Sequence, residues 1–414
     1  MRLPDLFSKL VSPKLEWKVL IGFSLLILVI QIVFLRKNPV VGETYWIAIN
    51  LQKGLGFAYY FPNETITTTV TSCFIPPLYC FILYLVLLVG GGAMAMQILG
   101  LLFFHAGNIT IYHFFKRHID SRLALVGFFL LGLYVPQWIL TQHVDPDGFN
   151  LLLVALTLLQ LDRLKPSSTL RQWILLGLLI GLQLLTRPDM LIGAICFSIW
   201  LLWRSDSKTY MLKRLAFALG VGLLVVIPWT IRNYIVFDRL ILISANSGYN
   251  FFLGNNPSAT GEFDQGPATP ERLALDSAKQ VYFATHLSDP ERDDFLKAQA
   301  FAWMKAHPGE VVTLDLKKFL YHWWSRDSVG NYLQMPGWTK VLYSAISIII
   351  VLLGLVGLWF MPAKPRSLLF TLFLYSSIIS TLFFAQTRHR AIKCDPYLVT
   401  LCVVGVHRIF TRKS

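Results

Sequence analysis

Apolar residues recur along the chain in long runs, and short polar segments rich in basic and aromatic residues separate these runs. The runs occupy residues 19–35, 77–89, 93–115, 123–141, 148–161, 172–186, 188–203, 214–229, 341–361, 367–385 and 395–411. A helix needs about 17–25 predominantly apolar residues to cross a bilayer. All runs are close to that length except 77–89 and 148–161, which are short. The pattern therefore predicts an all-α fold that crosses a lipid bilayer many times.

The composition agrees with this prediction and excludes several other classes of protein. Of the 414 residues, 55% are hydrophobic and 14% are charged, and the mean hydropathy is +0.56. Soluble domains carry roughly 25% charged residues. A net charge of +14 would suggest nucleic-acid binding in a soluble protein, but cytoplasmic loops of membrane proteins collect Lys and Arg. We therefore expect membrane lipid and no nucleic acid as a partner.

The basic loops predict which ends of the helices face the cytoplasm. Lys and Arg gather in segments 116–122, 163–171, 204–214, 364–366 and 408–413. All five segments can lie on the cytoplasmic side only if one of the apolar runs does not cross the bilayer. The short run 77–89, which follows Pro76, is the best candidate, and we expect a juxtamembrane or re-entrant helix on the outer side there. The prediction is then about ten spanning helices with both ends inside.

This topology divides the chain into three parts. Residues 1–229 form an N-terminal transmembrane module with a first outer loop at 36–76. Residues 230–340 form an extracytoplasmic loop region, and residues 341–414 form the C-terminal transmembrane helices. Within the loop region we expect three helices. One runs from Pro270 to His286, one starts with Asp289 as its N-cap and Pro290 at its first position, and an amphipathic helix at 311–324 lies on the membrane surface.

Three carboxylates on the predicted outer side are candidates for catalysis. Glu43 follows the first apolar run, and partial burial near lipid would raise its pKa as a general base requires; the alternative is an ordinary charge in a wet loop. Asp145 and Asp147 flank Pro146 before the run at 148–161. A helix cap explains Asp145 without a functional role. Two carboxylates there could also bind a divalent cation or orient an acceptor hydroxyl.

Cations on the predicted outer side contradict the positive-inside rule. Arg388, Arg390 and Lys393 lie with His389 in the short outer turn at 386–394. Such a cluster on the disfavoured side favours anion binding. Arg187, in the outer turn Leu-Thr-Arg-Pro-Asp, is a further candidate. An arginine that extends from a helix end toward water is the alternative for each of them.

Polar and aromatic residues in the outer loops suit sugar or acceptor hydroxyls. Arg232 and Asn233 follow a Pro-Trp pair at the end of a spanning run, where an interfacial anchor is the alternative. Tyr249 and Asn255 lie in a segment rich in Gly, Asn, Ser and Pro, which offers amide donors beside aromatic faces. Tyr45 adds an aromatic face close to Glu43.

The order of these segments resembles a known family. A loop carboxylate is followed by N-L-x-x-G-x-G-F, Pro-Pro-Leu-Tyr, an outer Asp, Leu-Thr-Arg-Pro and Pro-Trp-x-x-Arg-Asn-Tyr. Gly-Tyr-Asn, Gly-Asn-Asn-Pro and a final Arg-His-Arg motif complete the series. The series is similar to bacterial type C glycosyltransferases of the protein-mannosyltransferase and lipid A aminoarabinose-transferase kind. The resemblance runs over most of the chain.

The resemblance implies an inverting glycosyltransferase that uses a polyprenyl-phosphate sugar at the outer face of a bacterial plasma membrane. Glu43 matches the catalytic acid of the first outer loop, although relatives commonly carry Asp there. Asp145 or Asp147 matches the second acidic residue. Arg388, His389 and Arg390 match an Arg-Tyr-Arg-like motif, with His in place of Tyr. The donor phosphate is then expected to bind to Arg187, Arg388, Arg390 and Lys393. No cofactor is implied beyond a divalent cation that the carboxylates could hold, and the acceptor is an unidentified glycan, lipid or protein.

Two other functions remain compatible with the pattern. A flippase or transporter for lipid-linked sugars should carry charged residues or broken helices near the bilayer midplane. The charges of this chain instead gather at the predicted outer edge. A catalytically inactive membrane scaffold is the second alternative, and the departure of Glu43 from the usual Asp keeps it open.

Overall fold

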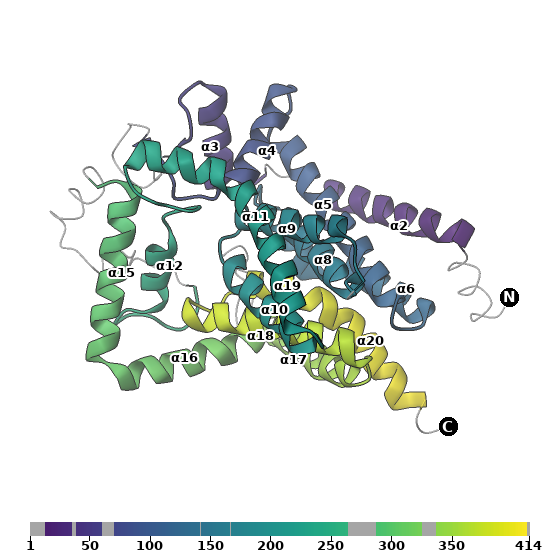
Figure 1. Cartoon of the computed structure of the whole chain (residues 1–414). Helices are drawn as coiled ribbons and strands as arrows, with labels where there is room; N and C mark the ends of the chain where they lie inside the picture. Colours follow the sequence, from purple (N-terminus) through teal and green to yellow (C-terminus); the bar gives the residue numbers. More distant parts are fainter. Residues whose placement is uncertain are drawn as a thin grey trace.

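The computed structural model describes residues 13–34, 39–59, 70–140, 142–165, 167–263, 287–324 and 337–411. Over these ranges the chain forms 17 helices and one two-stranded antiparallel sheet, in which β1 (Ala58–Tyr59) pairs with β2 (Val70–Thr71) (Figure 1). The all-α prediction is confirmed apart from this short hairpin. The helix expected from Pro270 to His286 lies outside the described residues.

Five of the described helices are long and apolar enough to cross a membrane. They are α2 (Pro13–Phe34), α5 (Ala93–Lys116), α11 (Lys208–Phe237), α17 (Gly337–Trp359) and α18 (Ala363–Leu382). Shorter apolar helices accompany them, namely α4 (Pro77–Leu88), α6 (Ser121–Gly132), α9 (Leu170–Leu184) and α10 (Met190–Arg204). Leu224 of α11 is 68% exposed, as expected of a side chain that faces lipid. The chain is a polytopic membrane protein, and the number of ten crossings stays a prediction.

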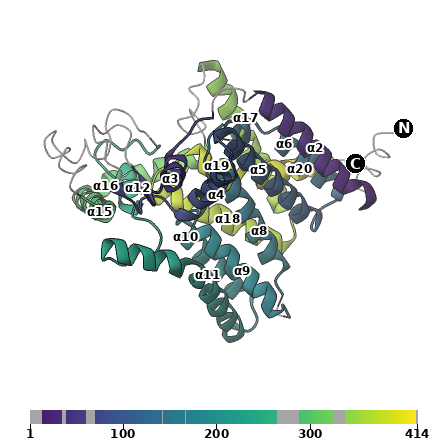
Figure 2. The same ribbon diagram turned by 90° about the horizontal axis from the view of Figure 1, so that it is seen from above.

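Ion pairs join several helix ends on one side of the bundle. Lys116 at the end of α5 pairs with Glu16 at the start of α2. Asp162, near the end of α8 (Asp147–Arg163), pairs with Arg117 at 2.8 Å, and Lys364 at the start of α18 donates to its backbone carbonyl. Figures 1 and 2 place the start of α2 and the end of α20 (Asp395–Thr411) at this same end. These contacts gather basic residues of the loops at 116–122 and 364–366 at one end of the bundle, and the inside location of that end stays a prediction.

Six further helices lie between the apolar helices in the chain. They are α3 (Glu43–Gln52), α7 (Val135–Leu140), α12 (Ser247–Gly254), α15 (Asp289–Ala306), α16 (Pro308–Trp323) and α19 (Thr387–Lys393). In Figures 1 and 2, α12 and α15 lie at the end of the molecule far from both chain ends. The 17 residues of α8 extend about 25 Å at 1.5 Å per residue, which separates its first residue from the inside ion pairs.

One expectation for the loop region needs correction. The N-cap of α15 is Ser288, which forms a capping box with Glu291, and Asp289 is the first helical residue. The carboxylate of Asp289 instead accepts hydrogen bonds from the hydroxyl of Ser72 and from the backbone amide of Cys73. The helix expected at 311–324 is present as α16, but it packs antiparallel beside α18: Lys318 bonds to the carbonyl of Thr381, and Trp323 donates to Ser377 at 3.0 Å. A helix at this position is therefore confirmed, and its place on the membrane surface stays a prediction.

Glycines allow α17 and α20 to approach closely, and this contact gives a first prediction. A Cβ built at Gly357 would lie 1.9 Å from the carbonyl oxygen of Leu401, a backbone atom that cannot rotate away. Replacing Gly357 by Ala should therefore destabilise the protein by about 1–3 kcal/mol through overpacking. Thermal unfolding in detergent measures the effect. Gly220→Ala is the matched control, because no atom lies within 4 Å of its Cβ, and an equal loss in both variants would contradict the prediction.

Candidate active site

The first outer segment pairs directly with the segment before α8. The amide of Val40 donates to the carbonyl of Gln142 at 3.1 Å, and the amide of Val144 donates back to Val40 at 2.9 Å. The hydroxyl of Thr44 donates to the carbonyl of Val144 at 3.0 Å. These bonds bring Glu43, the first residue of α3, close to Asp145. Two of the predicted catalytic carboxylates therefore lie together although 102 positions separate them.

Glu43 has the properties that a general base needs. Burial raises the pKa of its carboxyl above the ordinary value, and the negative charge of Asp145 raises it further. The carboxylate has no ion pair among the described residues, so it is not held by a cation as its two acidic neighbours are. A carboxylate with a raised pKa and without a bound cation can accept a proton from a hydroxyl group.

Arg388 of α19 lies between the other two carboxylates. Its Nη2 is 3.2 Å from Asp145 Oδ2, and its Nε is 2.6 Å from Asp147 Oδ2. The contact with Asp147 is an ion pair and not a hydrogen bond, because the N–H of Arg388 Nε does not point at the carboxylate oxygen. Burial raises the pKa of Asp147, and Arg388 opposes that shift. Arg388 thus neutralises two acidic side chains at the start of α8.

The structure overturns the capping role expected for Asp145. The N-cap of α8 is Pro146, with no side-chain cap, and Asp147 is the first helical residue. The local Asp-Pro pattern favours a cap, but the carboxylate of Asp145 instead pairs with Arg388. Asp145 thus pairs with Arg388, 243 positions away, and not with the backbone amides at the start of α8 that the pattern predicts.

A second group of charges surrounds Asp189, in the turn between α9 and α10. Lys393 of α19 forms an ion pair with Asp189 Oδ2, and the Nε of Arg187 is 3.6 Å from Oδ1. The hydroxyl of Tyr375, on α18, donates to Oδ2 at 3.2 Å. Arg187 and Lys393, both predicted to bind the donor phosphate, therefore meet at one carboxylate. Sequence reasoning missed Asp189 and Tyr375; Asp189 is the last residue of the Leu-Thr-Arg-Pro-Asp motif, which was its only sequence signal.

His389 is partly buried beside these cations. Burial lowers the pKa of its imidazole well below the ordinary value, and the nearby charges of Arg187 and Lys393 lower it further. The imidazole is therefore neutral at physiological pH. Its ring stacks on Phe384, with 6.1 Å between ring centroids. An aromatic ring thus occupies the middle position of the Arg-His-Arg motif without adding a third positive charge.

Arg390 faces a different part of the fold from Arg388. It is 1% exposed, and its Nε pairs with Asp395 at 2.7 Å. Its Nη1 donates to the carbonyl of Trp323 at 2.6 Å, and its Nη2 donates to Ser347. Every guanidinium nitrogen is therefore used to join α16, α17 and α20. This arrangement holds α19 in place and leaves no donor of Arg390 directed at the carboxylates of the site.

The residues predicted to bind sugar or acceptor serve mainly as contacts between elements. Arg232 donates to the carbonyl of Ser72 at 2.9 Å, and buried Asn233 donates to the carbonyls of Ile241 and Ile243. Asn255 donates to the carbonyl of Leu382 and accepts from Lys318. The ring of Tyr45 packs edge-on against that of Trp46, 5.3 Å away. Of this set, Tyr45 lies closest in the chain to Glu43.

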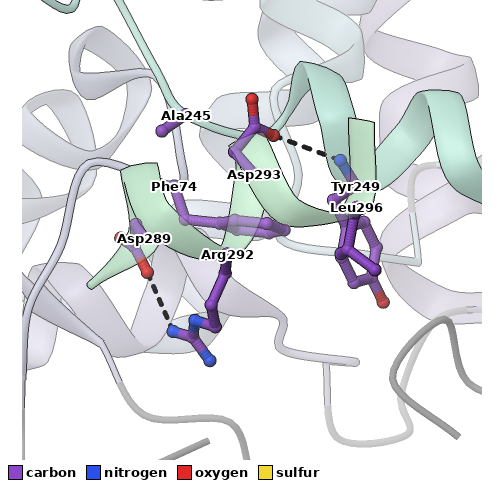
Figure 3. Close-up of a pocket in the computed structure, with 7 residues that line it drawn as sticks. All are labelled: Phe74, Ala245, Tyr249, Asp289, Arg292, Asp293 and Leu296. Atoms are coloured by element: carbon purple, nitrogen blue, oxygen red, sulfur yellow. Dashed lines mark hydrogen bonds and ion pairs between the residues drawn. The ribbon is translucent and has the colours of Figure 1, made fainter. Parts of the chain in front are cut away.

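Tyr249 belongs to a small pocket in the loop region, separate from the charged cluster. Figure 3 shows the pocket, which is lined by Phe74, Ala245, Tyr249, Asp289, Arg292, Asp293 and Leu296. The carboxylate of Asp293 accepts from the backbone amides of residues 248 and 249, and Asp289 pairs with Arg292 at 2.9 Å. The contacts of Asp293 hold α12 and α15 together, and none of these polar groups belongs to the group around Arg388.

A divalent cation has limited room in the cluster. Among the residues that the structure describes, no three His, Cys, Asp or Glu side chains converge in a way that could hold a metal ion. Asp145 and Asp147 are the nearest to such a pair, and Arg388 already lies between them. A metal ion held by both carboxylates would have to displace the guanidinium group.

The helical fold is that of a polytopic membrane protein, and a solved oligosaccharyltransferase shares this fold. Residues 75–231 match the family described as dolichyl-phosphate-mannose-protein mannosyltransferase. The resemblance seen in the sequence motifs is thereby confirmed. No curated protein sequence gives a significant match to the chain.

Several solved structures resemble the chain at low sequence identity. One is the archaeal oligosaccharyltransferase AglB from Archaeoglobus fulgidus, in complex with an inhibitory peptide and a dolichol-phosphate: the TM-score is 0.52, the identity 13%, and the match covers 96% of this chain and 51% of that one. ArnT from Cupriavidus metallidurans, bound to undecaprenyl phosphate, matches at a TM-score of 0.42 and 13% identity, covering 96% and 79%. This chain thus spans about half the length of the oligosaccharyltransferase that it matches, and the likeness concerns the fold.

Proposed function

We propose that this protein transfers a sugar from a polyprenyl-phosphate donor to an acceptor hydroxyl at the outer face of the membrane, with inversion at the anomeric carbon. The observation that supports this most is the meeting of Glu43, a carboxylate with a raised pKa, with the cations of α19 and Arg187 at one end of the bundle. The match of residues 75–231 to a mannosyltransferase family agrees with the same chemistry.

The proposed reaction needs one base and one group of cations. The acceptor oxygen forms a bond to the anomeric carbon and gives its proton to Glu43. The bond between that carbon and the phosphate oxygen breaks on the opposite face, and polyprenyl phosphate leaves with the electron pair. Arg187 and Lys393 hold the negative charge that develops on the leaving phosphate. No general acid is required, because a phosphate is a good leaving group once its charge is neutralised.

The cations divide into two roles in this proposal. Arg187 and Lys393 meet at a single carboxylate and have oxyanion-binding geometry. Arg388 neutralises Asp145 and Asp147, so that Glu43 can lose its proton beside them. Arg390, whose donors all bond to other helices, positions α19. The donor tail lies between helices beside α4, whose Leu85 and Leu88 are exposed.

Turnover by the full chain in liposomes tests the proposal. The native protein is expected to release polyprenyl phosphate from at least one member of a panel of radiolabelled polyprenyl-phosphate sugars. Arg187→Gln should weaken binding of polyprenyl phosphate roughly tenfold or more, because one of two charge-assisted contacts is lost. Lipid binding or lipid transfer across the bilayer without turnover, over the whole panel, would contradict the proposal and favour a flippase or a scaffold.

A further inference from the structure

The cations at the proposed phosphate site already have an anionic partner. Lys393, whose side chain is 2% exposed, forms an ion pair with Asp189, and Arg187 approaches the other carboxylate oxygen at 3.6 Å. The hydroxyl of Tyr375 donates to Asp189 Oδ2 at 3.2 Å, and the ammonium of Lys393 lies 4.8 Å from the centre of the Tyr375 ring. One carboxylate thus receives contacts from α9–α10, α18 and α19.

Helix capping does not explain this carboxylate. Asp189 precedes the first residue of α10, where a cap would lie, but its side chain makes no capping hydrogen bond. Burial tends to raise its pKa, whereas Lys393 and Arg187 outweigh that effect and hold the pKa well below the usual range. Asp189 is therefore ionised at every physiological pH, and both of its oxygens are directed at cations.

We propose that Asp189 is a positioning residue that acts as an internal counter-anion: it holds Lys393 and Arg187 at the phosphate site and competes with the phosphate for them. This inference rests on the proposed function. A carboxylate and a phosphate monoester are both oxyanions and accept from the same donors. Unpaired buried cations are costly, so the carboxylate stabilises the site between turnovers.

The competition has a consequence for turnover. Two buried cations without a counter-anion would bind the phosphate of the product lipid tightly, and product release would then limit the rate. Asp189 weakens that binding because the carboxylate regains its two partners as the phosphate leaves. Asp189 therefore lowers the affinity for polyprenyl phosphate while it supports turnover. Loss of a residue that only supports the fold would not raise that affinity.

Affinity for polyprenyl phosphate tests this inference. The native full chain and Asp189→Asn are compared in detergent, with polyprenyl phosphate as the ligand. The variant is expected to bind roughly tenfold tighter, which corresponds to about 1.4 kcal/mol, and to have a lower kcat. Asp189→Glu, which retains the charge, should recover most of the native affinity. Unchanged or weaker binding by Asp189→Asn would show that the residue only supports the fold and would overturn the inference.

Asp162→Asn is the matched control. The Asp162 side chain is 1% exposed, against 15% for Asp189, and it pairs with Arg117 at 2.8 Å and with His118 at 3.0 Å, but it lies at the end of α8 far from Asp147. Its replacement should leave the affinity unchanged; tighter binding by this variant as well would assign the effect to net charge and overturn the inference. A native chain that binds no polyprenyl phosphate would instead contradict the proposed function.

Thermal stability gives a second readout if Asp189→Asn folds poorly. Ligand that takes the place of the missing carboxylate should raise the Tm of Asp189→Asn more than it raises the Tm of the native protein. An equal or smaller rise in the variant would overturn the inference, because the phosphate would then not occupy the position of the carboxylate.

Discussion

Replacing Glu43 by Gln is expected to lower kcat for sugar transfer by about 10²–10⁴-fold, the range over which a general base contributes to a reaction. Gln has nearly the same shape and cannot accept the proton of the acceptor hydroxyl. Glu43 has no ion pair among the described residues, so its neutralisation leaves no cation without a partner. We therefore expect the Tm and the affinity for polyprenyl phosphate to stay close to their native values. Radiolabel transfer in liposomes measures the rate.

The pH dependence of the same reaction separates a base from a positioning residue. A base acts in its deprotonated form, so kcat/KM of the native enzyme should fall as the pH drops through the raised pKa of Glu43. Asp145→Asn removes a negative charge that contributes to this rise, and the fall should then move to lower pH. Glu43→Gln should abolish it. Native turnover by Glu43→Gln would mean that another group accepts the proton of the acceptor hydroxyl.

The helices of this protein were predictable because the signal for each is local. The apolar runs of α5, α11 and α18 are long, charge-poor and bounded by basic residues, and each corresponds to a helix in the structure. The His-Pro-Gly segment after α15 is likewise a local signal for the end of that helix. Its start was misplaced by one residue, because the Asp-Pro pair and the Ser-x-x-Glu capping box give competing signals.

The pairing within the site could not be predicted in the same way. Arg388 and Arg390 are two positions apart in one motif, yet Arg388 pairs with the carboxylates before α8, and Arg390 pairs with Asp395. The ion pair between Lys393 and Asp189 joins residues 204 positions apart. Sequence patterns report which residue types are present at the outer face. The packing of α19 against α8 and α10 decides which cation meets which acid.

The charge of Arg388 should matter to stability as much as to catalysis. Arg388→Gln removes the cation that pairs with both Asp145 and Asp147, and Asp147 is only 1% exposed. Breaking a buried ion pair from one side costs about 3–5 kcal/mol, so a large fall in Tm is expected. Arg239→Gln is the control, since Arg239 also pairs with an Asp at 2.8 Å but in a solvent-exposed place. Its loss should cost less than about 1 kcal/mol.

A compensating substitution separates the two roles of Arg388. The double variant Arg388→Gln with Asp147→Asn removes one charge of each sign, so most of the lost stability should return. Transfer should stay low, because Asp145 and Glu43 are still close together and the charge of Arg388, which favours ionised Glu43, is missing. The fall in kcat/KM with decreasing pH should accordingly begin at a higher pH than in the native enzyme. Native rates in the stable double variant would mean that Arg388 only balances buried charge. Recovery of stability without recovery of transfer would mean that Arg388 also keeps Glu43 ionised for its role as the base.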